Sequence, residues 1–159
     1  MYHKIQGKEN ISAAMSAGKL SETGFISGYA SVFGVLDGHR DQVERGAFDK
    51  TLRSWKLMGR APKMLWQHSP LKPIGVWTRL CEDARGLYVE GQLLLNVQQG
   101  REAYELIKHG ALEGLSIGFR TIAASIDQGR KIRVLKDIDL LEVSLVTFAS
   151  NTAARVGIY

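Results

Sequence analysis

Apolar and polar residues alternate along most of this chain, and that period of two most constrains what it can fold into. The alternation covers six runs, which are 24–34, 62–68, 74–80, 87–95, 114–126 and 131–148. Successive side chains of a β-strand point to opposite faces, so each run predicts a strand. The last two runs are joined by Asp127-Gln128-Gly129-Arg130, which is typical of a hairpin turn.

Two segments follow helical spacing instead. The segment 47–58 places Phe48, Leu52, Trp55 and Met58 on one stripe. The segment 100–112 does the same with Ala103, Leu106, Ile107 and Ala111. Both stripes predict helices whose apolar side packs against a core. Two helices inserted among some six strands predict a mainly β protein, a barrel or a sandwich, and not an alternating βαβ fold.

The length of the chain and its termini predict a single domain. The 159 residues are enough for one sizeable core. The polar, Ala/Ser-rich segment 1–23 predicts a flexible N-terminal arm or a cleavable leader, which leaves 24–159 as the folded domain. No run approaches the roughly 18 apolar residues that a membrane helix needs. The single cysteine, Cys81, excludes an intramolecular disulfide, and a cytoplasmic protein is the simplest interpretation.

The net charge of +5 is concentrated in one stretch that contains no acidic residue. Its five basic residues are Lys50, Arg53, Lys56, Arg60 and Lys63. A nucleic-acid interface would also need aromatic or base-reading residues, and only one tryptophan is interleaved here. The stretch therefore favours a solvated helix face or a docking surface for an acidic partner over nucleic-acid binding.

The sequence Gly114-Leu115-Ser116-Ile117-Gly118 has the G-x-S-x-G form of a serine hydrolase nucleophile elbow. An α/β-hydrolase elbow is followed by a helix, and its histidine lies later in the chain. Here the residues after Ser116 alternate as a strand does, and all four histidines precede it. The elbow interpretation is therefore excluded, and Ser116 is expected in mid-strand.

A serine in mid-strand can still be a nucleophile if an imidazole takes its proton. His3 lies near the terminus, His39 is in a polar turn, and His109 ends a predicted helix. His68 ends an apolar strand where the chain turns, a position that is half shielded and half accessible. It is the best candidate for a base, although a structural or surface role is equally compatible with the sequence.

The third member of such a site should be an acidic residue or a histidine from another strand. The run 137–148 offers Asp137, Asp139 and Glu142. This run is apolar on both faces, which indicates a buried strand, and Glu142 lies deepest in it. A buried carboxylate needs a partner, which could be a histidine or a basic residue such as Arg120.

Four segments, in this order and spacing, resemble the prohead (capsid maturation) proteases of tailed bacteriophages, a family related to the herpesvirus assemblins. They are GYASVFGVLDGHRDQVERGAF, WQH, GLSIGFR and LLEVSLVTFASN, and the likeness covers roughly residues 25–155. The resemblance implies a serine peptidase with a β-barrel core surrounded by helices. It implies that His68 and Ser116 are catalytic and that Glu142 is most simply the third member, where assemblins have a second histidine. It leaves Asp139 as the alternative acid.

The resemblance also suggests which groups stabilise the oxyanion. By analogy with the assemblins, the candidates are Ser150 and Asn151 in the turn 149–151, and Arg120 is a further one. The family often has a proline where this chain has Ala149. The chain ends at Tyr159, earlier than the resemblance leads us to expect, so a processed or truncated form is expected.

The function implied is that of a serine endopeptidase acting by acyl transfer, without a metal or cofactor. Its substrates would be scaffold or major capsid precursor proteins and the chain itself, inside assembling proheads in the host cytoplasm. Self-association as a dimer is expected by analogy, and neither nucleic acid nor a membrane is expected as a partner. Gly114 and Gly118 would leave room beside Ser116 for a substrate backbone. The alternative is a non-catalytic β-barrel scaffold or assembly module, in which Ser116 is merely a small packed residue.

Overall fold

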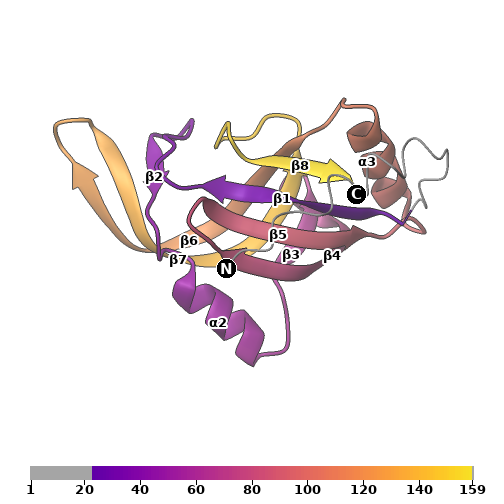
Figure 1. Ribbon diagram of the computed structural model, residues 1–159, viewed down its shortest axis with the longest axis horizontal. Helices are drawn as coiled ribbons and strands as arrows, with labels where there is room; N and C mark the ends of the chain where they lie inside the picture. Colours follow the sequence, from indigo (N-terminus) through magenta and orange to yellow (C-terminus); the bar gives the residue numbers. More distant parts are fainter. Residues whose placement is uncertain (1–22, 159) are drawn as a thin grey trace.

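The computed structural model describes residues 23–158 (Figure 1). The expected N-terminal arm or leader therefore lies, except for Thr23, outside the described residues. The elements in chain order are β1 (Phe25–Val32), β2 (Asp41–Val43), α2 (Asp49–Leu57), β3 (Lys63–Trp66), β4 (Ser69–Glu82), β5 (Gly86–Leu93), α3 (Gln98–Lys108), β6 (Gly114–Asp127), β7 (Ile132–Val146) and β8 (Arg155–Ile158). Among these residues no helix is both long and apolar enough to cross a membrane.

Seven of the strands form a closed barrel. Neighbouring strands follow the order β7-β3-β4-β5-β1-β8-β6, and β6 pairs back onto β7 to close the sheet. Strand β2 is added outside this ring, parallel to β7. Closure leaves the alternating apolar side chains of each strand facing one interior, and it decides between the barrel and the sandwich that the sequence left open.

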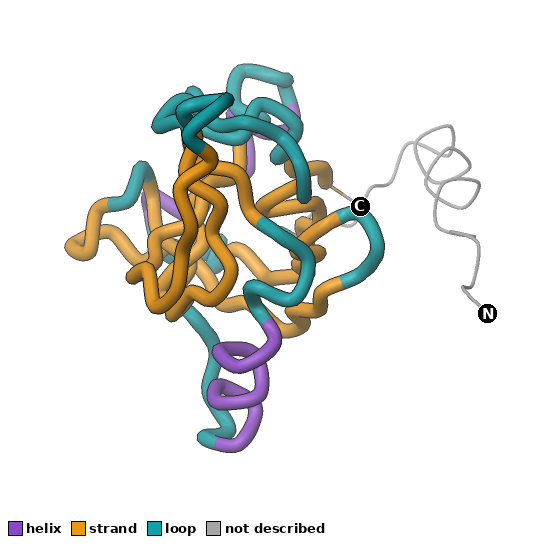
Figure 2. Tube along the Cα trace, turned by 90° about the vertical axis from the view of Figure 1, so that its left-hand side faces the viewer, coloured by secondary structure: helices purple, strands orange, loops and turns teal. Residues whose placement is uncertain are grey.

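The core is built mainly from aliphatic side chains of these strands, and the two helices cover its outside. Helix α2 packs on β7 and β4, whereas α3 packs on β4, β5 and β8. In both views α2 lies below the barrel (Figures 1 and 2). The largest fully buried side chains are Phe48, Ile26, Met64, Ile74, Leu87, Leu93, Leu115, Leu135, Ile138, Leu140, Leu145 and Val89.

The six predicted strands and two predicted helices are all present, and two further strands were missed. Strands β2 and β8 have three and four residues, too few for alternation to be recognised. The stripe predicted for α3 was only partly right: Ala103 and Ile107 are buried, but Leu106 is exposed and Tyr104 is buried instead.

Strand β7 pairs with three other strands, one on one edge and two on the other. One of its edges pairs with β6 along nearly its whole length. The other edge carries β2 beside residues 133–135 and β3 beside residues 142–145, both parallel to it. The far halves of β6 and β7 project beyond the barrel as a two-stranded ribbon (Figure 1).

Between β2 and β3, the backbone of β7 is hydrogen-bonded by α2 and by Ala47, which lies two residues before the helix. The Ile138 N–H donates to the Ala47 carbonyl at 3.1 Å, and the Leu140 N–H donates to Thr51 Oγ1 at 3.0 Å. The Leu140 carbonyl accepts from Trp55 Nε1 at 2.8 Å. These bonds satisfy buried backbone groups that no strand reaches, and they fix β7 two residues before Glu142.

Replacing Thr51 by Val should destabilise the fold. Valine has nearly the same shape but leaves the Leu140 N–H without an acceptor in a buried position, which costs about 1–3 kcal/mol. Equilibrium unfolding in urea measures this loss. The control is Thr51→Ser, which retains the hydroxyl and should lie closer to wild type. Equal midpoints for wild type and Thr51→Val would show that the bond contributes nothing.

Candidate active site

His68 lies in the two-residue turn that joins β3 to β4. Trp66 pairs with Ser69 across this turn, and its two central residues, Gln67 and His68, have φ of 50° and 61°. Positive φ at both positions is the requirement of a type I′ hairpin turn, and it is unfavourable for residues other than glycine. The predicted strand therefore ends at Trp66, and His68 belongs to the turn that follows it.

The strained turn is held against the end of β7. The Gln67 N–H donates to the Leu145 carbonyl at 2.9 Å. The Gln67 amide donates to Thr147 Oγ1 at 2.7 Å, and its oxygen accepts from the Thr147 N–H at 3.2 Å. Three hydrogen bonds from one residue thus fix the position of its neighbour, His68.

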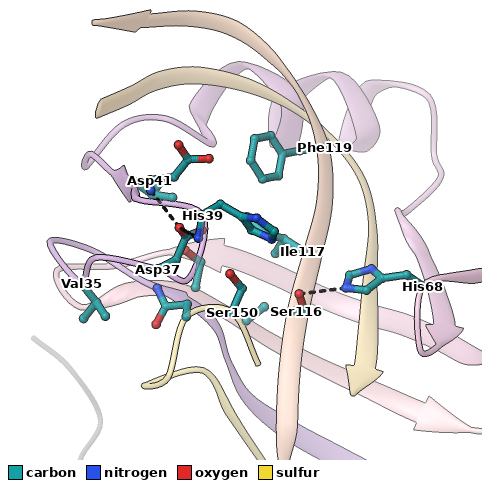
Figure 3. A pocket seen from close by; sticks show the side chains of 13 residues that line it. Val35, Asp37, His39, Asp41, His68, Ser116, Ile117, Phe119 and Ser150 are labelled. Carbon is teal, nitrogen blue, oxygen red and sulfur yellow. Dashed lines mark hydrogen bonds between the residues drawn. The ribbon is translucent and has the colours of Figure 1, made fainter. Parts of the chain in front are cut away.

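The imidazole of His68 connects Ser116 on β6 with Glu142 on β7. Its Nε2 lies 2.9 Å from Ser116 Oγ (Figure 3). Its Nδ1 is hydrogen-bonded to Glu142 Oε1. An ionised carboxylate only accepts, so Nδ1 donates and the neutral ring presents Nε2 as an acceptor to the serine hydroxyl. The side chain of His68 is 43% exposed, whereas that of Glu142 is 12% exposed. The imidazole is therefore reachable from solvent, and the carboxylate is shielded.

Ser144, which is fully buried, fixes the Glu142 carboxylate from the other side. Its hydroxyl donates to Glu142 Oε2 at 2.6 Å and accepts from the His68 N–H at 3.1 Å. The same hydroxyl thus contacts both the acid and the backbone of the turn that carries the imidazole. The sequence analysis missed Ser144, although its position two residues after Glu142 places it on the same face of the strand.

The register between β6 and β7 explains the glycine after Ser116. Ser116 lies opposite Ser144, and Gly118 lies opposite Glu142. A Cβ on Gly118 would lie 2.7 Å from Glu142 Cδ and 2.8 Å from its Cγ, distances that real Cβ atoms do not show. The expectation that both glycines make room for a substrate backbone is corrected here, because the space beside Gly118 is filled by Glu142. At Gly114 a Cβ would lie 2.6 Å from the carbonyl oxygen of Val146.

Glu142 raises the pKa of His68 above its usual 6.5. The hydrogen bond to the carboxylate is the main cause and its negative charge adds to it, while partial burial opposes both. A raised pKa means that the folded protein binds this proton more tightly than the unfolded chain does. The resulting stabilisation is complete below the unfolded pKa and is lost as pH rises through the folded one. For chemistry, it means that an imidazolium formed on His68 is favoured.

The other predicted residues occupy different positions around Ser116, His68 and Glu142. Ser150 and Asn151 line a cavity together with His68 and Ser116, whereas Arg120 does not line it. The Asn151 amide donates to the Val32 carbonyl at 3.0 Å, so that nitrogen has a structural partner.

Asp139, the alternative acid, pairs in the β6–β7 register with Arg120, and the carboxylate that is hydrogen-bonded to His68 is that of Glu142. Within the described range, no group of three or more His, Cys, Asp or Glu side chains is arranged to hold a metal ion.

The sequence profile of the caudovirus prohead serine proteases matches residues 12–159. The chain belongs to this family. It is 34% identical over 136 residues to the prohead protease of Enterobacteria phage HK97, covering 84% of this chain and 59% of that protein. It is 36% identical over 126 residues to the prohead protease of Escherichia phage T5, covering 79% of this chain and 58% of that protein. The chain thus spans less than two thirds of the length of either relative.

Two solved structures share the fold of this prohead protease family member. The capsid assembly protease of bacteriophage T4 has a TM-score of 0.61 at 9% identity, covering 77% of this chain and 81% of that one. The KSHV protease, solved with a hexapeptide phosphonate inhibitor, has a TM-score of 0.52 at 12% identity, covering 83% and 63%. The predicted fold, an assemblin-like β-barrel with helices outside it, is therefore confirmed.

Gly118→Ala should separate Glu142 from His68 while the barrel still folds. The added methyl group occupies the space of the Glu142 side chain, so the carboxylate must move off the imidazole. The pKa of His68, followed by NMR titration, should then fall toward 6.5. The matched control is Gly129→Ala, where the nearest atom would be 3.5 Å from the new Cβ, and it should leave that pKa unchanged. An unchanged His68 titration in Gly118→Ala would contradict the steric argument.

Proposed function

We propose that this chain is a serine endopeptidase in which Ser116 is the nucleophile and His68 is the general base. Glu142 orients the imidazole of His68 and stabilises its protonated form. The observation that carries this proposal is the unbroken hydrogen-bonded series Ser116–His68–Glu142. Nucleophile, base and orienting acid in such contact form the arrangement of acyl-transfer catalysis. Membership of the prohead serine protease family supports the same assignment.

In the proposed reaction, Ser116 Oγ attacks the scissile carbonyl while His68 Nε2 takes the hydroxyl proton. The Oγ–C bond forms, the tetrahedral intermediate collapses, and the C–N bond breaks as His68 returns the proton to the leaving amine. Water then attacks the acyl-enzyme while His68 takes one of its protons. The bond from the acyl carbon to Ser116 Oγ breaks, and His68 returns the proton to Oγ. Glu142 stabilises the imidazolium in both halves, and Ser144 holds Glu142 in place.

The developing oxyanion requires donors beside Ser116, and we propose the turn 149–151 for this role. Ser150 supports this choice because it lines the cavity next to Ser116. Arg120 remains the second candidate, although it lies outside that lining. Removing one donor of an oxyanion hole typically reduces kcat by about 100- to 1,000-fold, so substitutions at each position separate the two.

The open edge of β6 offers a binding site for an extended peptide. The Leu115 N–H donates to Ala154 on one side of β6, and β8 pairs with β6 only at Gly114. Because backbone groups alternate along a strand, the N–H and C=O of Ile117 face that same edge, beyond the end of the β8 pairing. A substrate added there as an antiparallel strand would have its backbone next to Ser116.

The substrates proposed are scaffold or major capsid precursor proteins and the chain itself, cleaved inside proheads in the host cytoplasm. The basis is the family and its named relatives, the prohead proteases of phages HK97 and T5. A dimer is proposed as the active form. The basic stretch 50–63 is proposed to bind an acidic scaffold segment, since Arg53 and Lys56 on α2 and Arg60 after it are all exposed.

Ser116→Ala should abolish processing. Wild type and variant are each co-expressed with the capsid precursor, and cleavage is followed by intact mass. A fluorophosphonate should label wild-type Ser116 and fail to label His68→Ala. The matched control is Ser125→Ala on the exposed part of the same strand, which should process normally. Equal processing by wild type and Ser116→Ala would refute the serine mechanism and favour the non-catalytic assembly module.

Glu142→Gln should reduce the rate by roughly 100-fold or more and move its pH dependence. His68 acts as a base only when neutral, so the wild-type rate falls as pH drops through a pKa above 6.5. Glutamine cannot stabilise the imidazolium, so the midpoint of the pH–rate profile should shift to lower pH. The control is Asp139→Asn, which should change neither the rate nor the midpoint. A larger effect in Asp139→Asn would transfer the role to that residue.

A further inference from the structure

A groove of about 540 Å³ lies on the outside of the barrel, lined by α2, the turn after it and β4. Among the described residues that line it there is no aspartate or glutamate. Its charged residues are four cations, which are Arg53, Lys56, Arg60 and Arg79. A hollow surface with charges of one sign attracts partners of the other sign, so this groove favours an anionic partner.

Three of the four cations form no salt bridge within residues 23–158. Arg79 does form one, since its Nη1 lies 3.2 Å from Glu90 Oε1. Lys50, on the same helix, lies 2.6 Å from Asp137 Oδ2 and does not line the groove. The only acidic residue of α2, Asp49, is in its first turn and forms no salt bridge with the three. The three unpaired cations are all exposed, and they are Arg53, Lys56 and Arg60.

The groove also offers apolar surface. Four half-buried side chains line it, which are Leu52, Trp55, Ala61 and Leu80. At the end of α2, directly after Lys56, Leu57 is 88% exposed and Met58 is 52% exposed. Apolar side chains that lie in water among charged ones are typical of surfaces that bind another protein.

We propose that this groove docks an acidic, amphipathic segment of the protein that this chain cleaves. Carboxylates of the segment would pair with Arg53, Lys56 and Arg60, and its apolar side chains would pack on the half-buried lining. That the partner is the substrate rests on the proposed peptidase function. The site is the groove and not the basic stretch 50–63 as a whole, because Lys50 is already paired and Lys63 does not line it.

This chain does not supply a segment of that chemistry from its own N-terminus. Residues 1–22 contain three lysines and two glutamates, which gives a formal net charge of +1. A second copy of the chain would bring a net charge of +5 to the same surface. The charge therefore favours a different protein as the partner.

The two tryptophans of the groove argue against a nucleic acid as its partner. Single-stranded nucleic acids bind where aromatic faces are free to stack on the bases. Trp77 is 4% exposed, and its indole N–H donates to the Val143 carbonyl at 3.2 Å. The indole N–H of Trp55 donates to the Leu140 carbonyl at 2.8 Å. Both rings are thus fixed to the backbone of β7, and the cations stand without a stacking platform.

The test measures binding by fluorescence anisotropy, with Ser116→Ala as the protein so that no peptide is consumed. The probes are a labelled peptide in which glutamates flank leucines, the same peptide with glutamine for glutamate, and one with serine for leucine. A labelled oligothymidylate of equal net charge is the fourth probe. The glutamate–leucine peptide should bind tightest and lose affinity as salt rises, and the glutamine peptide should bind about tenfold more weakly or less. The serine peptide should also bind more weakly, because it lacks the apolar contacts.

The combined variant Arg53→Gln, Lys56→Gln and Arg60→Gln locates the effect. It should weaken binding of the glutamate–leucine peptide about tenfold or more, as expected for three exposed ion pairs. Its urea midpoint should stay near that of the parent, because these side chains form no salt bridge in the fold. The matched control is Lys72→Gln, an exposed cation on β4 outside the groove, which should leave the affinity unchanged.

Equal affinities for the glutamate and glutamine peptides, or unchanged binding by the combined variant, would overturn the docking site. Tighter binding of oligothymidylate that the combined variant loses would replace it with a nucleic-acid site.

A second measurement tests whether the partner is the substrate. The three substitutions are placed in the chain that retains Ser116, and this chain is co-expressed with the capsid precursor. Processing should be slower than in wild type, whereas an alkyl fluorophosphonate should label Ser116 at the same rate in both. Normal processing by this variant would overturn the assignment of the partner. Failure of the peptidase function itself looks different, because the fluorophosphonate would then not label wild type while the peptide still bound.

Discussion

The pairing of β6 with β7 is the constraint on which the site depends. It closes the barrel, and its register sets Ser116 opposite Ser144 and Gly118 opposite Glu142. Side chains alternate between the faces of a sheet, so a slip of one residue would send the serine and the carboxylate to different faces. The missing side chain at Gly118 then lets Glu142 lie over its neighbouring strand toward the imidazole.

The opposite edge of β7 positions the turn that carries His68. Helix α2 binds the backbone of β7 just before Glu142, and the side chain of Gln67 binds it just after, at Thr147. Gln67 and His68 both have positive φ, an arrangement that persists only where surrounding contacts enforce it. The hydrogen bonds of Gln67 to Leu145 and Thr147 are those contacts. The strained turn is therefore held in place by the end of β7, the strand that carries Glu142.

The sequence predicted those parts of the structure that depend on local pattern. Alternation predicted the six longer strands, and the cost of burying an unpaired carboxylate singled out Glu142, which the structure brings against His68. What it could not predict depends on contacts between distant segments. The chain turns at Gln67 and His68 only because β7 holds both residues there. The missing side chain at Gly118 matters only because the register places Glu142 opposite it. The catalytic roles themselves stay predictions.

The loop that carries Asp37 connects the cavity wall with the same framework. Its Gly38 N–H donates to the Ser150 carbonyl at 3.1 Å, and Asp41 binds Arg133 on β7. The loop 37–41 and Glu142 are therefore both attached to strand β7.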